Sequence, residues 1–310
     1  MRAAFIQTLV ELAAQDERIL LLTADLGYLA IEPFADRFPD RFFNVGVAEE
    51  NMLGVATGLA DSGFIPFVYS IVPFAVLRPF EFIRNGPIMH RLPVRIVGVG
   101  GGFEYGHNGL THYGVEDVGV MRTQPGIRVV APADHEQTRT ALRRTWNVAG
   151  PVYYRIGKDD RTVVTGLGGR FELDEVQTVR PGRDVVIAAM GSIAPEAVAA
   201  AEQLRKQGVD AEVIVVASIH PAPERSLLSV LRRFPVCVTV EAHYLSGGLG
   251  SLVAEVIAEA SVPCRLARCA VRELPIGVTG SQRFMHERSG LDRAAIVRRT
   301  LEALKTGGNA

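Results

Sequence analysis

Apolar residues recur along the chain in two alternating patterns. Short runs rich in Val, Ile and Leu predict buried strands, and apolar residues spaced three and four apart predict amphipathic helices between them. This alternation predicts an α/β fold with mostly parallel sheets flanked by helices. In the first half we expect helices at 3–15, 31–37, 49–61, 73–86, 115–122 and 134–147, and strands at 19–24, 42–45, 64–69, 94–99, 127–131 and 151–155.

The same alternation restarts after a polar, glycine-rich stretch. Segment 157–182 has no long hydrophobic period and is the best candidate for a linker. We therefore predict two consecutive domains, residues 1–165 and 183–310, joined by a linker at 166–182. In the second domain we expect helices at 194–207, 223–233 and 248–260, and strands at 184–189, 210–217, 236–241 and 264–269.

Composition narrows the class of protein. The chain has 310 residues, 48% of them apolar, and a net charge of −1, so neither nucleic acid nor an anionic membrane is an expected partner. Three cysteines without C-x-x-C spacing and seven histidines without ligand spacing predict no metal site. Residues 1–19 contain acids and predict a helix rather than a signal sequence, and no apolar run reaches transmembrane length. We expect a cytoplasmic protein.

One junction between a strand and a helix carries candidate chemistry. The predicted strand ends at Gly46, and Glu49 and Glu50 begin a helix whose apolar face includes Met52 and Leu53. Because a helix dipole favours acids in the first turn, both glutamates could simply be helix-start residues.

Residues 46–49, Gly-Val-Ala-Glu, resemble the G-[IV]-x-E pattern of thiamine-diphosphate enzymes of the transketolase type. The resemblance implies that Glu49 contacts a ring nitrogen of the cofactor's aminopyrimidine and activates the cofactor. That role needs a carboxyl group in a dry, apolar site that can hold a proton near neutral pH. The order of elements matches the family's pyrimidine-binding and C-terminal domains over nearly the whole chain. In the second half, TVEAHYLSGGLGS is similar to a family segment in which Glu241 and His243 would orient a loop and a subunit contact.

A second motif lies in the segment GHNGLTHYGVED. Thr111 and His112 are similar to the T-H-Q of transketolases, and Glu116 follows four residues after the histidine, as in those enzymes. The resemblance implies that His112 contacts substrate oxygens and moves protons, a task for a side chain that titrates near pH 7. Tyr113 replaces the usual glutamine. A lone histidine in a loop is otherwise more often a packing residue.

The resemblance also implies a binding surface for the cofactor. Phe74 matches the aromatic residue that stacks on the pyrimidine ring. Ile71 and Leu77, three residues away on either side, are predicted to share its helix face, although ordinary core packing gives the same spacing. Tyr69 at the preceding strand end could line the same wall. Asp25 matches an aspartate of the family's A-D-[LI] segment, and it could bind across a dimer interface or cap the next helix.

Positions matched to substrate contacts depart in part from the family pattern. Arg155 stands where relatives carry an arginine that binds a sugar phosphate, with a surface ion pair as the alternative, and Arg78 is a weaker anion-binding or interface candidate. Gly100 replaces a donor-binding histidine, and Asn108 replaces an aspartate that contacts a donor hydroxyl. Because a buried partner left unpaired costs about 1–3 kcal/mol, these changes predict an unusual sugar substrate.

The family's motif for the diphosphate and its magnesium, G-D-G followed by an asparagine, is missing from the sequence. Glycine-rich loops at 98–109 and 246–251 do not follow the dinucleotide pattern in register. The resemblance therefore implies half an enzyme. Thiamine diphosphate, with Mg²⁺ (or Ca²⁺), would be held through a diphosphate-binding N-terminal transketolase subunit, in an α₂β₂ assembly.

The leading expectation is transfer of a two-carbon ketol unit from a ketose or ketose phosphate to an aldehyde. The β subunit of a 2-oxoacid dehydrogenase E1 component has the same architecture, but it would carry an H-S-Q-like segment. A reaction like that of deoxyxylulose-phosphate synthase stays open. A non-catalytic stabilising subunit is the alternative from another class, and it would have no need for both Glu49 and His112.

Overall fold

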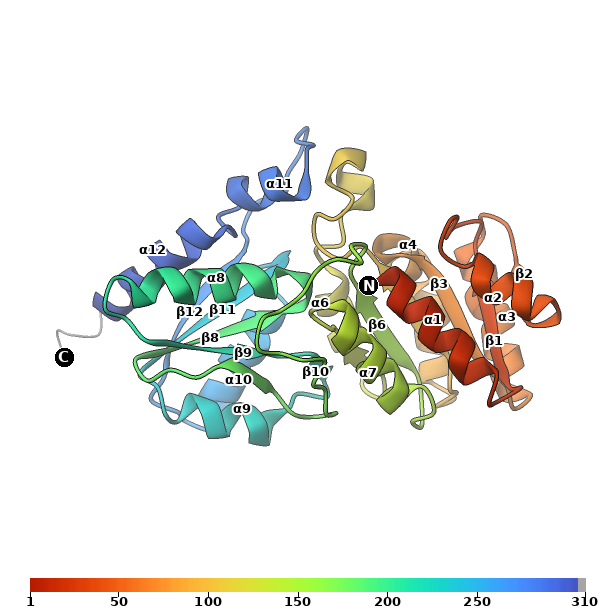
Figure 1. Ribbon diagram of the computed structural model, residues 1–310. Helices are drawn as coiled ribbons and strands as arrows, with labels where there is room; N and C mark the ends of the chain where they lie inside the picture. Colours follow the sequence, from red (N-terminus) through yellow and green to blue (C-terminus); the bar gives the residue numbers. More distant parts are fainter. Residues whose placement is uncertain (306–310) are drawn as a thin grey trace.

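The computed structural model describes residues 1–305, which form two sheets side by side with helices on their faces (Figure 1). The seven strands of the first sheet are β1 (Ile19–Thr23), β2 (Phe42–Asn44), β3 (Ile65–Ile71), β4 (Arg95–Val99), β5 (Arg128–Val130), β6 (Val152–Ile156) and β10 (Ser218–His220). The five strands of the second are β7 (Gln177–Arg180), β8 (Val185–Met190), β9 (Ala211–Val215), β11 (Val236–Tyr244) and β12 (Arg265–Val271).

The helices of the first half are α1 (Arg2–Ala13), α2 (Glu32–Arg37), α3 (Glu49–Asp61), α4 (Val72–Val76), α5 (Phe80–Ile83), α6 (Asp117–Arg122) and α7 (His135–Thr145). Those of the second half are α8 (Ala194–Arg205), α9 (Glu224–Leu231), α10 (Leu249–Glu259), α11 (Gln282–Arg288) and α12 (Arg293–Lys305). Short helical turns lie at Pro39–Arg41, Arg84–Ile88, Gly106–Asn108, Leu110–His112 and Gly191–Ile193. No helix in this part of the chain has the length and apolarity needed to cross a bilayer.

Both sheets are mostly parallel, which confirms the expected fold class. The strand order is β10-β5-β6-β4-β3-β1-β2 in the first sheet and β12-β11-β8-β9-β7 in the second, and only β10 and β7 pair antiparallel. Central strands such as β1 and β8 are buried along their whole length, as continuous apolar runs predict. One core lies beneath α1, α7, α8 and α12, and the other beneath α3, α6, α9 and α10.

The parallel register brings several loops to one edge of the first sheet. Thr23 of β1 pairs with Tyr69 of β3, and the ends of β3, β4 and β6 also pair in sequence. Asn44 of β2 pairs with Thr23 on its other side. The loops that leave the carboxyl ends of β2, β3 and β4 carry the start of α3, the helix α4 and segment 100–112. Ligands of parallel α/β sheets bind at such an edge, so the fold gathers the candidate residues where a site is expected.

Three expected elements differ in the structure. The helix expected at 73–86 is broken into α4, α5 and a π-helical turn, because Pro79 and Pro87 have no N–H to continue a regular helix. The strand expected at 210–217 is shorter, as β9 in the second sheet, and an additional strand that was not expected, β10, follows it and pairs with β5 in the first sheet. Within the expected linker, β7 pairs with β9.

Candidate active site

Glu49 begins α3 and is almost completely buried, with 2% of its surface exposed. Gly46 makes the turn into this helix with a φ of +75°, a conformation that glycine adopts without strain. The helix then buries Met52, Leu53 and Ala56 in the core, which fixes its first turn. Glu49 therefore stands at the carboxyl edge of the sheet on a rigid element.

Glu49, Arg78, Phe74 and His112 form a continuous group, here called the Glu49 cluster. Nη1 of Arg78 lies 2.9 Å from Oε1 of Glu49 and donates a hydrogen bond to it. The Arg78 guanidinium also lies over the Phe74 ring, with its central carbon 4.0 Å from the ring centroid. The Phe74 and His112 rings meet edge to face at 5.2 Å. The structure thus brings together four of the residues that the sequence singled out.

His112 is partly buried at the end of a short 3₁₀ turn. Its Nδ1 is 2.9 Å from the hydroxyl oxygen of Thr111. Burial lowers the pKa of His112 below its ordinary value, and the positive charge of Arg78 lowers it further. A neutral imidazole near neutral pH can both accept and donate protons, as the predicted role requires.

Tyr105 belongs to this site although the sequence analysis did not select it. Its ring lies 6.4 Å from that of His112, centroid to centroid. Gly100 has a φ of +81°, and any side chain there would collide with the Tyr105 ring. Tyr105 therefore covers the position where transketolases carry a histidine side chain. In the sequence, Tyr105 could have been noticed as an aromatic residue within the glycine-rich loop 98–109.

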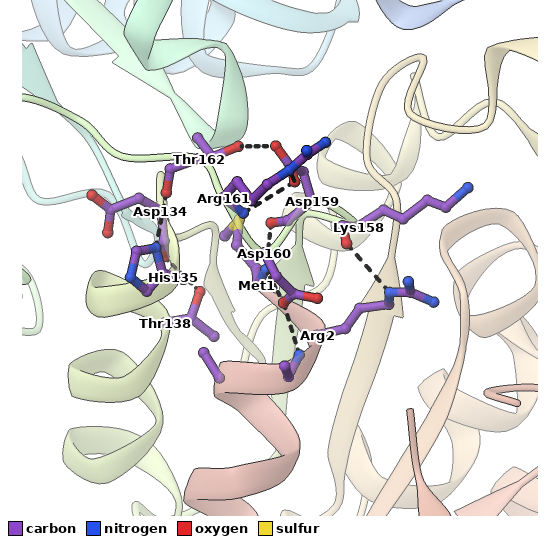
Figure 2. Close-up of polar contacts among 12 residues, drawn as sticks. Met1, Arg2, Asp134, His135, Thr138, Lys158, Asp159, Asp160, Arg161 and Thr162 are labelled. Atoms are coloured by element: carbon purple, nitrogen blue, oxygen red, sulfur yellow. Dashed lines mark hydrogen bonds and ion pairs between the residues drawn. The ribbon is translucent and has the colours of Figure 1, made fainter. Parts of the chain in front are cut away.

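Lys158 is a second residue that the sequence analysis missed. Its Nζ lies over the Tyr105 ring, 4.5 Å from the centroid. The loop that carries it is tied to the start of α1: the Met1 amino group contacts the Asp160 carboxylate at 2.6 Å, and Nε of Arg2 donates to the Lys158 carbonyl oxygen at 3.3 Å. Figure 2 shows the side chains of Lys158 and Arg2 extending to the same side of this loop.

Arg155 does not present its guanidinium group to a substrate. Its side chain is 4% exposed, and Nε lies 2.9 Å from Oδ2 of Asp117. Nη2 donates to the carbonyl oxygens of Gly114 and Ala242, at 2.8 and 2.9 Å. In this arrangement the guanidinium group of Arg155 is enclosed by the two halves of the chain and joins them, which does not support the predicted contact with a phosphate.

Two further buried groups lie beside this junction, Glu241 bonding within the second half and His243 bonding across to the first. Glu241 accepts hydrogen bonds from the backbone N–H groups of Leu249 and Gly250 at the start of α10, and burial raises its pKa to about 7. Nε2 of His243 accepts the N–H of Gly119 in α6 at 3.1 Å, and burial lowers the pKa of this histidine. Both residues position helices, and Asp117 with Arg155 completes the group, here called the domain bracket.

The remaining aromatic and apolar candidates lie in different places. Ile71 ends β3 in an extended conformation, so the prediction that it shares one helix face with Phe74 is wrong. Leu77 directly follows α4 and keeps a helical conformation, three residues after Phe74. Leu77 is 36% exposed. Tyr69 is buried in the other core, with its ring 6.1 Å from that of Phe5, and burial raises its pKa. Tyr69 therefore does not line the wall beside Phe74.

Two polar candidates lie in loops at the same edge of the sheet. Asp25 has a φ of 55°, and it accepts hydrogen bonds from Asn44 and Tyr28, which lower its pKa. It joins the ends of β1 and β2 and does not cap α2. Asn108 is exposed at the end of a 3₁₀ turn, where its backbone N–H donates to the Tyr105 carbonyl.

The chemistry available to the site follows from these groups. The Glu49 cluster combines a buried carboxyl group, an aromatic face and an imidazole, which suits a planar nitrogen heterocycle beside a substrate. Within residues 1–305, no group of three or more His, Cys, Asp or Glu side chains is arranged to hold a metal ion.

The sequence matches two domain profiles that account for this arrangement. Residues 1–161 match the transketolase pyrimidine-binding domain, and residues 174–296 match the transketolase C-terminal domain. The chain belongs to the transketolase family. The resemblance seen in the motifs is thereby confirmed.

Several relatives are single subunits of about this length. The chain is 37% identical to the 6-deoxy-6-sulfo-D-fructose transketolase subunit of Clostridium sp. (strain MSTE9), over 96% of this chain and 92% of that one. It is 33% identical to an apulose-4-phosphate transketolase subunit of Phocaeicola vulgatus, over 98% and 97%. A solved split-gene transketolase, an inactive β4 tetramer, superposes with a TM-score of 0.87 at 35% identity, covering 98% of this chain and 97% of that one.

Proposed function

We propose that this chain is one subunit of a thiamine-diphosphate-dependent enzyme that transfers a two-carbon ketol unit from a ketose or ketose phosphate to an aldehyde. The observation that carries the proposal is the Glu49 cluster: a carboxyl group that is 2% exposed, an aromatic ring and a histidine lie together at the carboxyl edge of a parallel sheet. The transketolase subunits that resemble the chain over almost its full length support the same conclusion.

The residues present fit the aminopyrimidine half of the cofactor. Glu49 can exchange a proton with a ring nitrogen from a dry position, and Phe74 offers a face on which a planar ring can stack. When bound, thiamine diphosphate supplies the carbon nucleophile for cleavage of the ketose carbon–carbon bond. His112 would hydrogen-bond substrate oxygens and carry protons to and from them, because its neutral form is favoured and its ring packs edge to face with Phe74.

The diphosphate and its Mg²⁺ (or Ca²⁺) require groups that this chain does not supply in the family's pattern. The sequence has no G-D-G motif, and residues 1–305 hold no cluster of metal-ligand side chains. We therefore assign the diphosphate site to an N-terminal transketolase subunit and propose an α₂β₂ assembly in which activity requires both chains. The subunit designations of the relatives support a divided enzyme.

Lys158 and Arg2 replace Arg155 as candidates for binding an anionic substrate terminus. Both side chains project to one side of the loop after β6, and Lys158 lies against Tyr105 beside His112 (Figure 2). A phosphate or sulfonate at the end of the sugar would be compatible with this positive charge. Asn108 remains a candidate for a hydroxyl contact, because its side chain is exposed in the loop between Tyr105 and His112.

Isothermal calorimetry with thiamine diphosphate and magnesium tests the proposal. The chain alone should bind weakly or not at all, and the chain with a G-D-G-containing partner should bind tightly. Glu49→Ala or Phe74→Ala should abolish binding to the mixture without preventing assembly. Failure of a stable two-chain complex to bind the cofactor would contradict the proposal and favour a non-catalytic subunit.

One alternative reaction has specific support. The chain is 34% identical to the 1-deoxy-D-xylulose-5-phosphate synthase of Thermomicrobium roseum, over 98% of this chain but 48% of that protein. A decarboxylating reaction with a 2-oxoacid would therefore be the second candidate, and it would also cover the 2-oxoacid dehydrogenase alternative. Assaying the assembled enzyme with a ketose phosphate and with pyruvate separates the two: only ketol transfer proceeds without release of carbon dioxide.

A further inference from the structure

Arg78 makes two contacts at once in the Glu49 cluster. Its guanidinium donates a hydrogen bond to the buried Glu49 carboxyl group, 2.9 Å away, and lies over the Phe74 ring, 4.0 Å from its centroid. A planar group that donates N–H to Glu49 while covering Phe74 has the same two partners that the aminopyrimidine ring would have.

We infer that Arg78 holds the place of the aminopyrimidine ring in the free subunit, so that the cofactor binds this chain by displacing the guanidinium group. The inference rests on the proposed function, because it takes Glu49 and Phe74 as the cofactor contacts. A guanidinium and an aminopyrimidine are both flat nitrogen-rich groups with N–H donors at their edge. They therefore compete for one carboxyl group and one aromatic face, and both cannot be bound there together.

The position of Arg78 suits exchange. Its side chain is 44% exposed, whereas that of Glu49 is 3% exposed, so only the arginine can swing into water. Arg78 lies in the turn between α4 and α5, next to Pro79, and its movement does not require a helix to unwind. Until displacement, the guanidinium satisfies a buried carboxyl group that would otherwise lack a partner, which is unfavourable in an apolar site.

Displacement also changes the surroundings of His112. The charge of Arg78 is one of the two causes that lower the pKa of this histidine, and it acts across the Phe74 ring. Once the guanidinium leaves, His112 is in contact with the cofactor site rather than with a fixed positive charge. The free subunit thus keeps Glu49 and Phe74 in contact with Arg78, and binding of the cofactor releases both.

Calorimetry on the chain assembled with its diphosphate-binding partner tests the exchange. Arg78→Ala removes the competing group, and thiamine diphosphate should bind at least about threefold more tightly than to the wild-type assembly. Arg84→Ala is the matched control, because Arg84 is an exposed arginine one helical segment away whose side chain contacts only Asn85 among the described hydrogen bonds. Its affinity should equal that of the wild type. Equal or weaker binding by Arg78→Ala would overturn the inference.

A second readout needs no cofactor. In the free Arg78→Ala subunit, added methylguanidinium should occupy the emptied position between Glu49 and Phe74 and raise the midpoint of thermal unfolding. The increase should vanish in the double variant Arg78→Ala/Glu49→Gln and in wild type, where Arg78 already fills the position. Absence of the increase in Arg78→Ala would also overturn the inference. If the increase appears while no assembly binds thiamine diphosphate, the proposed function fails and the placement of Arg78 stands.

Discussion

The molecule contains two arginine–carboxylate pairs of the same chemistry in opposite surroundings. In the Glu49 cluster, Arg78 is 44% exposed and Glu49 3%, whereas in the domain bracket Arg155 and Asp117 are 4% and 1% exposed. The first pair has one partner that can leave, so its carboxyl group can be offered to a ligand. The second is enclosed and tied to two carbonyl groups, so it can only hold the halves together. The exposure of Arg78 is therefore what makes the Glu49 pair a candidate for ligand exchange, whereas the Arg155 pair has no partner that can leave.

The largest expected effect is on catalysis, from a substitution of Glu49 in its pair with the exposed Arg78. Glu49→Gln keeps the size of the side chain but removes its ability to exchange a proton, and the rate of ketol transfer by the assembled enzyme should fall by about 10²–10⁴-fold. Glu50→Gln, at the adjacent exposed position in the same helical turn, is the control and should keep the wild-type rate. Steady-state kinetics measure both. A Glu49→Gln enzyme that retained more than a tenth of the rate would remove the functional distinction between the two pairs.

The enclosed pair of Arg155 and Asp117 should contribute mainly to the free energy of unfolding. Asp117→Ala leaves the Arg155 charge buried without its carboxylate and removes the acceptor of the Tyr153 hydroxyl, so the free energy of unfolding should fall by about 3–5 kcal/mol. Glu11→Ala breaks the exposed pair with Arg143 and should cost no more than about 1 kcal/mol. Urea unfolding of the variants measures both values. Similar losses of unfolding free energy for Asp117→Ala and Glu11→Ala would show that burial of the Arg155–Asp117 pair adds no stability over the exposed Arg143–Glu11 pair.

Most of the fold could be predicted from local patterns. Continuous apolar runs mark β1 and β8, which are buried along their whole length, and Gly46 marks the turn into α3. Pairing between distant segments leaves no such local pattern, so β7 and β10 were missed. The three-residue strand β10 follows β9 closely, and only its partner in the other sheet separates it from that strand.

The sequence predicted only those residues of the candidate site that belong to recognisable motifs. Glu49, Phe74 and His112 meet because parallel strands end at one edge, a consequence of topology that the order of elements already implied. The enclosure of Arg155 could not be predicted, because a strand-end arginine has the same sequence signal whether its side chain faces a ligand or another domain. Lys158 was missed because its position depends on the Tyr105 ring, which lies far away in the sequence.

The buried His286 should make the stability of the protein depend on pH more strongly than the partly buried His112 does. Burial lowers the pKa of His286 to about 4, against about 6.5 in the unfolded chain. As the pH falls below 6.5, the unfolded chain gains a proton that the folded chain cannot take up until about pH 4. Stability should therefore decrease across this interval, by about 3 kcal/mol from this group, and then level off.

Urea unfolding at pH 7.5 and pH 4.5 measures this dependence. His286→Gln should reduce the loss of stability between the two pH values, because glutamine does not titrate. His112→Gln is the comparison at the more open site, where burial is less complete, and it should change the loss by a smaller amount. An equal reduction by both substitutions would mean that the two histidines are not distinguished by burial.

The smallest expected effect is on the affinity for a phosphorylated substrate, from a substitution of Lys158 beside Tyr105. Lys158→Ala removes the charge that lies over Tyr105, and the KM for a phosphorylated ketose should rise about tenfold, equivalent to about 1.4 kcal/mol. The kcat should change little, because Lys158 is proposed to contact the anionic terminus and not the bond that breaks. Arg161→Ala removes an equally charged but 94% exposed side chain of the same loop and is the control.

The dephosphorylated ketose decides whether the effect on KM is specific. Its KM should be the same in the wild type and in Lys158→Ala, because it carries no anion for the lysine to contact. Lys158→Arg should recover most of the affinity for the phosphorylated ketose, since it restores the charge and can also lie on an aromatic face. A rise in KM for both ketoses would instead mean that Lys158 supports the loop around Tyr105. Lys158 would then act by packing against Tyr105, as the residues of the domain bracket act by holding neighbouring elements together.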